Sequence, residues 1–167
     1  MTLPNTDLVH LICGSTGAGK TTYAQAMADD VGGICFSIDE WMVTLFGNDA
    51  PKDLTPAWFA PRVSRCEMQM WAMALRLGQQ GIPSILDLGF QRREHRQKFA
   101  SLIEASQFSA KLHVLDVDAS VRWERVQSRN SAPGKTFSME ITRGMFDYIE
   151  TIWERPSEQE VDMISAI

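Results

Sequence analysis

Residues 14–21 carry the strongest chemical signal in the sequence. They read Gly-Ser-Thr-Gly-Ala-Gly-Lys-Thr, which fits the pattern G-x-x-x-x-G-K-[ST] at every fixed position. Glycines leave backbone N–H groups open to phosphate oxygens, and a helix beginning near Lys20 adds the positive end of its dipole. Lys20 is expected to reach the β- and γ-phosphates, and the Thr21 hydroxyl to coordinate Mg²⁺. The motif therefore predicts binding of a nucleoside triphosphate, taken as ATP, together with Mg²⁺.

A simpler interpretation is a Gly-rich turn that only connects a strand to a helix. The match lies between a predicted strand and a predicted helix, which disfavours that interpretation. The residues expected to bind the nucleotide are Gly14, Ser15, Thr16, Gly17, Ala18, Gly19, Lys20, Thr21, Thr22, Arg125 and Arg129.

Asp39 is the candidate for a general base. It lies just beyond a predicted strand, residues 34–38, at the sheet edge where open α/β folds bind their ligands. A carboxylate there can accept or orient the proton of an acceptor hydroxyl during phosphoryl transfer. The alternative is that Asp39 caps a helix over residues 40–46. Glu40 is the second candidate for the base.

Asp87 ends another predicted strand, residues 83–88. A carboxylate in this position can bind Mg²⁺ through water or take part in acceptor binding. We therefore expect Thr21 and Asp87 to be the magnesium ligands of the protein. The alternative is that Asp87 is only a polar residue that ends a strand before a turn.

Arg122, Arg125 and Arg129 follow one another at helical spacings of three and four, within a sector of about 60°. Guanidinium groups bind phosphates through paired hydrogen bonds, so the stripe is expected to contact the triphosphate. Arg129 is assigned a catalytic role because it borders the polar loop 131–136, whose Pro-Gly pair is typical of a lid. The alternative is a solvated helix face with Glu124 as a partner.

Further side chains surround the expected acceptor cleft. The arginines are Arg62, Arg65, Arg92, Arg93 and Arg96, which are expected either to bind an anionic acceptor or to be solvated. The aromatic residues are Trp41, Trp58 and Phe59, which are expected to form an acceptor wall or to belong to the core. The histidines, interpreted as strand and surface residues and not as ligands, are His10, His95 and His113.

Short apolar runs alternate with helical patterns, which is typical of a parallel sheet flanked by helices. The predicted strands are residues 8–13, 34–38, 83–88 and 111–117, and residues 161–167 are either a short fifth strand or a tail. The predicted helices begin near residues 20, 62, 92, 119 and 138. Tyr23, Met27 and Val31 are expected to form the inner face of the first helix. Residues 41–61 are expected to lack a long helix because prolines and a glycine interrupt them.

The composition fits a single domain over residues 1–167, with 44% hydrophobic residues to build a core. The formal charge of −5 argues against a protein that binds nucleic acid over its whole surface. We find no apolar run long enough for a membrane span, and residues 1–7 lack the features of a signal peptide. The three cysteines show no metal-ligand spacing. We therefore expect a cytoplasmic protein with reduced thiols.

A phosphate-binding loop alone does not separate kinases from other NTPases. The chain has no Asn-Lys-x-Asp guanine signature, and its match to D-x-x-G at residues 30–33 lies at a helix end instead of after a strand. The further signature segments of transporter and ring-forming ATPases are not visible. The short chain and the arginine-bearing segment favour a kinase.

With these motifs the sequence resembles the small P-loop kinases related to chloramphenicol phosphotransferase, zeta-toxin kinases and the kinase domain of polynucleotide kinase. The resemblance rests on residues 14–22, 37–40, 87, 90–96, 129–130 and the segment from 146 through 158–160. It implies a three-layer α/β P-loop fold, a five-stranded parallel sheet of order 2-3-1-4-5, an acceptor-side helical region and an arginine-bearing lid. It also places the base at Asp39.

Two departures from this family bear on function. Polynucleotide kinases have an arginine shortly after the catalytic Asp that holds the acceptor phosphate, whereas this chain has Trp41-Met42. Related proteins often follow the Asp of the third strand with a small residue and then Thr or Asn, whereas this chain has Leu88-Gly89. The first departure weakens the nucleic-acid interpretation, and the second leaves the hydrogen bonding of Asp87 open.

We therefore expect an ATP-dependent phosphotransferase that moves the γ-phosphoryl group to a hydroxyl of a small molecule, with Lys20, Asp39 and Arg129 as catalytic residues. Two alternatives stay open: a 5′-hydroxyl nucleic-acid kinase, and an ATP-binding regulatory switch without efficient turnover. No motif specifies the acceptor, a preference for ATP over GTP, or the oligomeric state.

Overall fold

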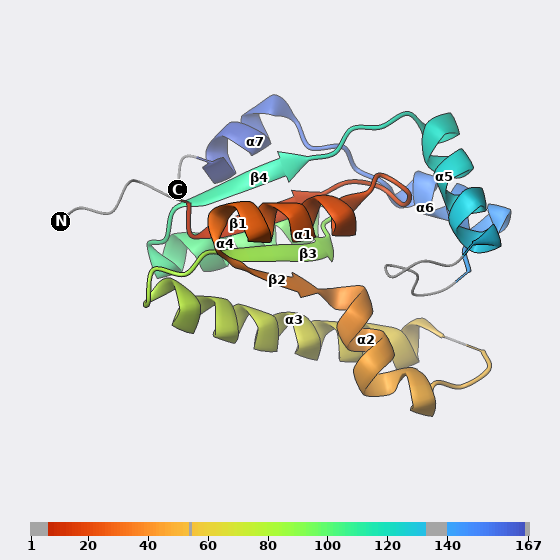
Figure 1. The fold of residues 1–167 in the computed structure, drawn as a ribbon, viewed down its shortest axis with the longest axis horizontal. Helices are drawn as coiled ribbons and strands as arrows, with labels where there is room; N and C mark the ends of the chain where they lie inside the picture. Colours follow the sequence, from red (N-terminus) through yellow and green to blue (C-terminus); the bar gives the residue numbers. More distant parts are fainter. Residues whose placement is uncertain (1–6, 54, 133–139, 166–167) are drawn as a thin grey trace.

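The computed structural model describes residues 7–53, 55–132 and 140–165. Its centre is a sheet of four parallel strands, β1 (Val9–Cys13), β2 (Ile34–Ser37), β3 (Ser84–Gly89) and β4 (Ala110–Val114). Their order across the sheet is β2-β3-β1-β4 (Figure 1). The predicted α/β P-loop fold is confirmed, and so is the predicted order of its first four strands.

Helices cover both faces of the sheet (Figure 1). They are α1 (Lys20–Val31), α2 (Ile38–Phe46), α3 (Pro56–Gly78), α4 (Arg93–Ser106), α5 (Ala119–Ser131), α6 (Arg143–Ile152) and α7 (Glu158–Ser165), with a 3₁₀ turn η1 (Gly47–Asp49) after α2. The core on one face is formed with α1, and the larger core on the other face with α3, α4 and α7. This arrangement gives the three layers.

The alternation of side chains along the strands divides them between the two cores. In β1, Leu11 and Cys13 belong to the large core with α3 and α4, whereas Ile12 packs against Ala24 of α1. In β3, Asp87 is turned toward α1, where it meets the first turn of the helix. The polar end of β3 is thereby directed to the strand-to-helix turn that follows β1.

The inner face of α1 differs from the prediction at one position. Tyr23 is 38% exposed, and its hydroxyl lies 2.9 Å from Nδ1 of His113. The buried residue is Ala24, and Met27 and Val31 pack beside it as predicted. Ala24, Met27 and Val31, at positions i, i+3 and i+7, therefore face the sheet. This spacing is the usual apolar stripe of a helix.

The predicted fifth strand is wrong within the described residues, because residues 158–165 form α7. This helix packs beside β4 (Figure 1). Glu160 and Ile164, one helical turn apart, are both buried. A short apolar run fits a strand or a helix equally well, so the packing of Ile164 against the core decides between them.

The sequence predicts a helix that starts just after Pro61, but α3 begins at Pro56. Thr55 accepts a hydrogen bond from the Trp58 N–H, and Pro56 occupies the first turn, where a missing N–H costs nothing. Pro61 lies further inside, and α3 continues through it. The expectation of no long helix in residues 41–61 is therefore wrong, because this region contains most of α2 and the start of α3.

No helix within the described ranges combines the length and the apolarity needed to cross a bilayer. The three cysteines are free thiols. Burial raises the pKa of Cys13 and of Cys35 to about 11, so both are protonated at neutral pH. Among the described residues, no group of three or more Asp, Glu, His or Cys side chains is placed to hold a metal.

Candidate functional site

Residues 14–19 connect β1 to α1, and Lys20 and Thr21 begin α1. We call residues 14–21 the phosphate-binding turn. Gly17 and Gly19 have φ angles of 80° and 89°, in the left-handed region that glycine enters without strain. Gly19 precedes α1 without a side-chain cap, and the first turn of α1 contains no acidic residue. The first N–H groups of α1 are therefore available to an anion.

The Lys20 side chain folds back over this turn. Its Nζ donates a hydrogen bond to the Ser15 carbonyl over 3.1 Å. Burial lowers the pKa of Lys20, while the carboxylates of Asp87 and Asp39 act in the opposite direction. A phosphate bound at this turn would add negative charge beside the ammonium and so favour its protonated form.

Thr21 and Asp87 form a direct contact between α1 and β3. Oγ1 of Thr21 donates to Oδ2 of Asp87 over 2.7 Å, so Asp87 is bonded despite the unusual Leu88-Gly89 that follows it. Burial raises the pKa of Asp87, the Thr21 hydrogen bond and Lys20 lower it, and Asp39 adds to the increase. The pair presents a hydroxyl and a carboxylate, the hard oxygen donors that Mg²⁺ takes.

Asp39 lies in the first turn of α2, which follows β2 without a connecting loop. The cap of α2 is Ser37, whose Oγ accepts a hydrogen bond from the Glu40 N–H over 3.4 Å. The alternative that Asp39 is the helix cap is therefore wrong. Asp39 is exposed and close enough to Lys20 and Asp87 to affect the pKa of both.

A cavity of about 840 Å³ brings these groups together. One wall contains residues of the phosphate-binding turn and α5, including Lys20, Thr21, Arg125 and Arg129. The other wall contains Asp39 and residues of α3 and α4, including Phe59, Val63, Glu67 and His95. Asp87 also lines the cavity. The residues expected to bind the nucleotide and the proposed base therefore border one cavity.

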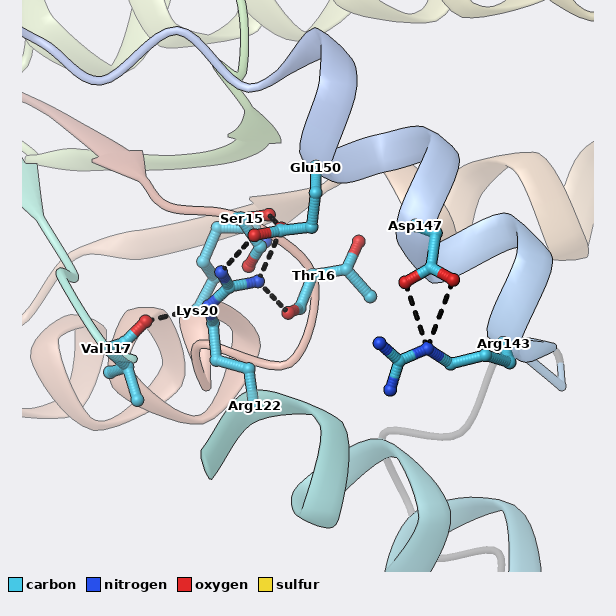
Figure 2. Close-up of polar contacts among 8 residues, drawn as sticks. All are labelled: Ser15, Thr16, Lys20, Val117, Arg122, Arg143, Asp147 and Glu150. Carbon is cyan, nitrogen blue, oxygen red and sulfur yellow. Dashed lines mark hydrogen bonds and ion pairs between the residues drawn. The ribbon is translucent and has the colours of Figure 1, made fainter. Parts of the chain in front are cut away.

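Arg122 is neither a phosphate ligand nor part of a solvated face, and both expectations for it are wrong. It is buried, and its Nη1 and Nη2 donate to the two carboxylate oxygens of Glu150 over 2.8 and 2.7 Å (Figure 2). Nη1 also donates to the Thr16 carbonyl, and Ser15 Oγ donates to the same Glu150 carboxylate. The Arg122 hydrogen bonds hold the pKa of Glu150 below its usual value, with help from Ser15.

We call Arg122, Glu150 and Ser15 the clasp, because they join α5, α6 and the phosphate-binding turn. A side chain at Gly17 would meet the Arg122 carbonyl with its Cβ at 2.6 Å, so the glycine also allows this close approach. The spacing of arginines on α5 could not reveal the clasp, because Glu150 lies 28 residues further along the chain. The clasp fixes the turn from outside the cavity.

Replacing Arg122 with alanine is expected to lower the free energy of unfolding by about 3 kcal/mol, because the half-buried Glu150 carboxylate loses its partner. Arg143→Ala is the matched control, since Arg143 pairs with Asp147 on α6 and both side chains are more than half exposed (Figure 2). It should change stability by no more than about 0.5 kcal/mol. Denaturant unfolding measures both, and equal small changes would show that the clasp contributes little.

Arg125 and Arg129, in contrast to Arg122, line the cavity. Arg125 is exposed, and its Nη1 lies 3.4 Å from the Ala18 carbonyl that it donates to. Nε of Arg129 is buried and has no hydrogen-bond partner among the described residues. An unpaired guanidinium N–H in a cavity wall is suited to an anionic ligand.

The predicted lid, residues 131–136, falls mostly outside the described residues, which end at 132 and resume at 140. The two flanking segments are joined by Asn130. Its amide group donates to the Ile141 carbonyl over 2.8 Å and accepts from the Ile141 N–H over 3.2 Å. Asn130 and Ile141, on either side of the undescribed residues, are thus joined next to Arg129.

The second wall carries a polar cluster that sequence reasoning missed. Glu67 of α3 is buried, with Oε1 2.8 Å from Nε2 of His95 and Oε2 3.3 Å from Nζ of Lys98. His95, interpreted from sequence as a surface residue, is partly buried in the cavity wall. The spacing of three between His95 and Lys98 places them on one face of α4. The partner on α3 could not be found without the fold.

Arg96 contradicts both expectations for it, since it neither lines the cavity nor is solvated. It is 1% exposed and pairs with Glu160 of α7, with Nε 2.6 Å from Oε1. Its Nη1 donates to the Phe90 carbonyl over 2.9 Å. Phe90 has a φ of 48°, which is uncommon for a non-glycine residue, and this bond helps to hold it there.

The other acceptor-side expectations have mixed outcomes. Phe59 and Arg92 line the cavity. Trp41 packs against the core beside Phe36. Arg62 lies over the Trp58 ring, 4.3 Å from its centroid. Only part of the expected aromatic wall therefore reaches the cavity.

Known proteins share this fold. A family model described as AAA domain matches residues 9–150. A gluconokinase from Sinorhizobium meliloti 1021 is 17% identical with a TM-score of 0.60, over 90% of this chain and 77% of that one. Kti12 from Chaetomium thermophilum, in complex with ADP-AlF3, is 12% identical with a TM-score of 0.66, over 90% and 82% of the two chains.

A chain of the Pnkp1/Rnl/Hen1 RNA repair complex is 17% identical with a TM-score of 0.67, over 91% of this chain but 46% of that one. No curated protein matches the sequence significantly. At these identities the similar structures show the fold alone. They confirm the predicted resemblance to P-loop kinases at that level.

Proposed function

Because this chain belongs to the AAA-domain family, we propose that it is an ATP-dependent phosphotransferase that acts on a hydroxyl of a small molecule. One observation carries the proposal: a single cavity has the phosphate-binding turn on one wall, and Asp39 with the α3–α4 surface on the other. A nucleotide switch has no need of a second wall with its own carboxylate. We also treat residues 1–167 as a single domain.

On the nucleotide side, the N–H groups of the turn and of the first turn of α1 would hold the β- and γ-phosphates. Lys20 would exchange its hydrogen bond to the Ser15 carbonyl for bonds to phosphate oxygens. Thr22 follows the motif and also lines the cavity. The clasp would keep the turn in the conformation that these contacts need.

Thr21 and Asp87 fit a magnesium site, because their oxygens already lie 2.7 Å apart beside Lys20. Mg²⁺ is commonly held by one or two carboxylates together with substrate phosphates, which agrees with this small set of donors. When bound, the ion would neutralise part of the phosphate charge. Asp87 would be ionised in that state, since a nearby cation opposes the effect of burial on its pKa.

On the acceptor side, Asp39 would take the proton of the acceptor hydroxyl. The acceptor oxygen forms its bond to the γ-phosphorus as the bond from that phosphorus to the β–γ bridging oxygen breaks, and ADP leaves. Lys20 and Arg129 would stabilise the charge on the transferring group. Arg125 would bind the nucleotide phosphates from α5.

Replacing Arg129 with alanine is expected to lower turnover about 10²- to 10³-fold while ADP affinity changes little, because its proposed partner is charge that develops during transfer. Arg125→Ala should affect nucleotide affinity more than turnover. Steady-state kinetics combined with titration by ADP separates the two effects. Small and equal losses at both positions would show that neither arginine acts on the transferring group.

A 5′-hydroxyl nucleic-acid kinase is the second candidate, supported by the likeness of fold to a chain of an RNA repair complex. Against it, the segment just after Asp39 reads Trp41-Met42 where polynucleotide kinases have an arginine, and the protein has a formal charge of −5. A gluconokinase and a sugar kinase share the fold, so hydroxyl-bearing metabolites are the first acceptors to test.

The deciding experiment is a screen for ADP formation from Mg·ATP in the presence of sugars, sugar acids, nucleosides, antibiotics and 5′-hydroxyl oligonucleotides. We expect stimulation by a small hydroxyl compound and transfer of labelled γ-phosphate to it. Stimulation by oligonucleotides alone would establish the second candidate. Tight ATP binding without stimulation by any compound would favour a regulatory switch.

A further inference from the structure

We propose that Glu67, His95 and Lys98 form a subsite for an anionic group of the acceptor, so that the substrate is a small hydroxy acid or a phosphorylated alcohol. This inference rests on the proposed phosphotransferase function and specifies its substrate class. We call these three residues the α3–α4 cluster. It lies in the wall of the cavity that also contains Asp39 and the phosphate-binding turn.

The contacts within the cluster leave hydrogen-bond donors for a ligand and no free carboxylate. One oxygen of Glu67 lies 2.8 Å from His95 Nε2 and the other lies 3.3 Å from Lys98 Nζ. Burial raises the pKa of Glu67, but His95 and Lys98 outweigh it, so the pKa lies below its usual value and the group is ionised. Glu67 is occupied on both oxygens, and this disfavours a cationic ligand.

His95 in contrast keeps its second ring nitrogen, and Lys98 keeps further N–H groups. Lys98 is 39% exposed, which leaves its ammonium accessible. Lys98 and Arg92 both line the cavity, and their cationic N–H groups can bind a carboxylate or a phosphate.

The His95 ring is held in place by its surroundings. It stacks on Phe90 with the ring centroids 4.8 Å apart and meets the edge of Phe99 at 5.3 Å. Phe90 and Phe99 are fully buried. The Phe90 carbonyl is fixed in turn by Arg96, and a buried ion pair fixes Arg96. A rigid ring presents its free nitrogen in one direction, which a recognition site requires.

The α3 residues before Glu67 define the rest of the subsite. Phe59, Ala60, Val63 and Ser64 line the cavity with it, and their spacing places them on one face of the helix. This face carries apolar and small side chains but no cation. A polymer with many phosphates would require a longer series of cations, whereas a single anionic group matches the cluster. The structure therefore favours a small acceptor with one charged end.

The test measures ligand binding and phosphoryl transfer separately, in the presence of Mg²⁺ and a non-hydrolysable ATP analogue for binding and of Mg·ATP for transfer. The probes are matched pairs of hydroxyl compounds: glycerate and glycerol, gluconate and sorbitol, and glycerol 3-phosphate. The carboxylate and phosphate probes distinguish the two kinds of anion. Ligand-observed NMR gives binding, and ADP formation gives transfer.

We expect at least one anionic probe to bind about 10- to 100-fold more tightly than its neutral partner, the range expected for hydrogen bonds to a charged group. Lys98→Met should remove most of this preference and raise KM with little change in kcat. His95→Gln is the second variant. Lys111→Met, which changes an exposed lysine on β4, is the control and should behave as the wild type.

The inference is overturned if no anionic probe binds, if neutral and anionic partners bind equally, or if Lys98→Met binds as the wild type. Transfer to neutral acceptors without preference would keep the phosphotransferase and remove the subsite. Binding of an anionic probe without transfer would keep the subsite and remove the proposed function. If a 5′-hydroxyl oligonucleotide binds and none of the small probes does, the inference is overturned and the α3–α4 cluster belongs to a nucleic-acid site.

Discussion

Lys20→Ala is expected to weaken binding of Mg·ATP at least about 100-fold while the fold survives. Each hydrogen bond between charged groups contributes about 1.5–3 kcal/mol, and Lys20 is positioned to make such bonds to phosphate. Within the described part of the chain its Nζ donates to the Ser15 carbonyl, and burial lowers its pKa. Its loss therefore removes little that stabilises the fold.

Calorimetric titration with Mg·ATP at fixed salt measures the affinity, and thermal unfolding followed by circular dichroism checks the fold. Lys111→Ala, which removes an exposed lysine far from the motif in sequence, controls for the change in net charge. Wild-type affinity in the Lys20 variant would show that the turn at residues 14–21 does not hold the phosphates. A loss of both affinity and fold would leave Thr21→Ala as the variant that decides.

Asp39→Asn is expected to lower acceptor-dependent turnover by about 10²- to 10⁴-fold, the usual contribution of a general base. Melting temperature and ATP affinity should stay near the wild-type values. The structure gives two reasons for this: Asp39 is exposed, and Ser37 provides the cap of α2. The amide keeps the shape of the side chain and removes only its basicity.

Glu40→Gln is the matched control for Asp39→Asn, because Glu40 is the next residue, is also exposed and does not line the cavity. Steady-state kinetics with the acceptor found in the screen measures both variants. Turnover at the wild-type rate in Asp39→Asn would exclude Asp39 as the base. A loss of turnover in Glu40→Gln alone would assign the general base to Glu40. No loss of turnover in either variant would make Asp87 the next candidate.

The nucleotide side of the site could be predicted from the sequence because its parts are contiguous or lie at strand ends. Residues 14–21 are one continuous segment, so their types and order already specify the backbone turn and the helix start. Asp39 follows one predicted parallel strand and Asp87 lies at the end of another, and the carboxyl ends of such strands meet at one edge. The structure brings both close to Lys20 for this reason.

The tertiary structure alone decided which charged side chains are free and which are partners of one another. Arg122 and Arg129 have the same residue type and belong to the same helical stripe, yet Arg122 is bonded to Glu150 and Arg129 lines the cavity. Arg96 is similarly paired with Glu160. These pairs join residues separated by 28 and 64 positions, so no local pattern contains them.

Contacts between residues far apart in the chain also explain the acceptor wall and α7. Glu67 lies 28 residues before His95 in the chain, and only the packing of α3 against α4 brings their side chains within 2.8 Å. Residues 158–165 form a helix because Ile164 packs into the core beside β4. The sequence by itself determined the kind of site and its phosphate-binding half, because those depend on local backbone chemistry. The tertiary structure decided the acceptor half, because it is assembled from elements that meet only in the folded chain.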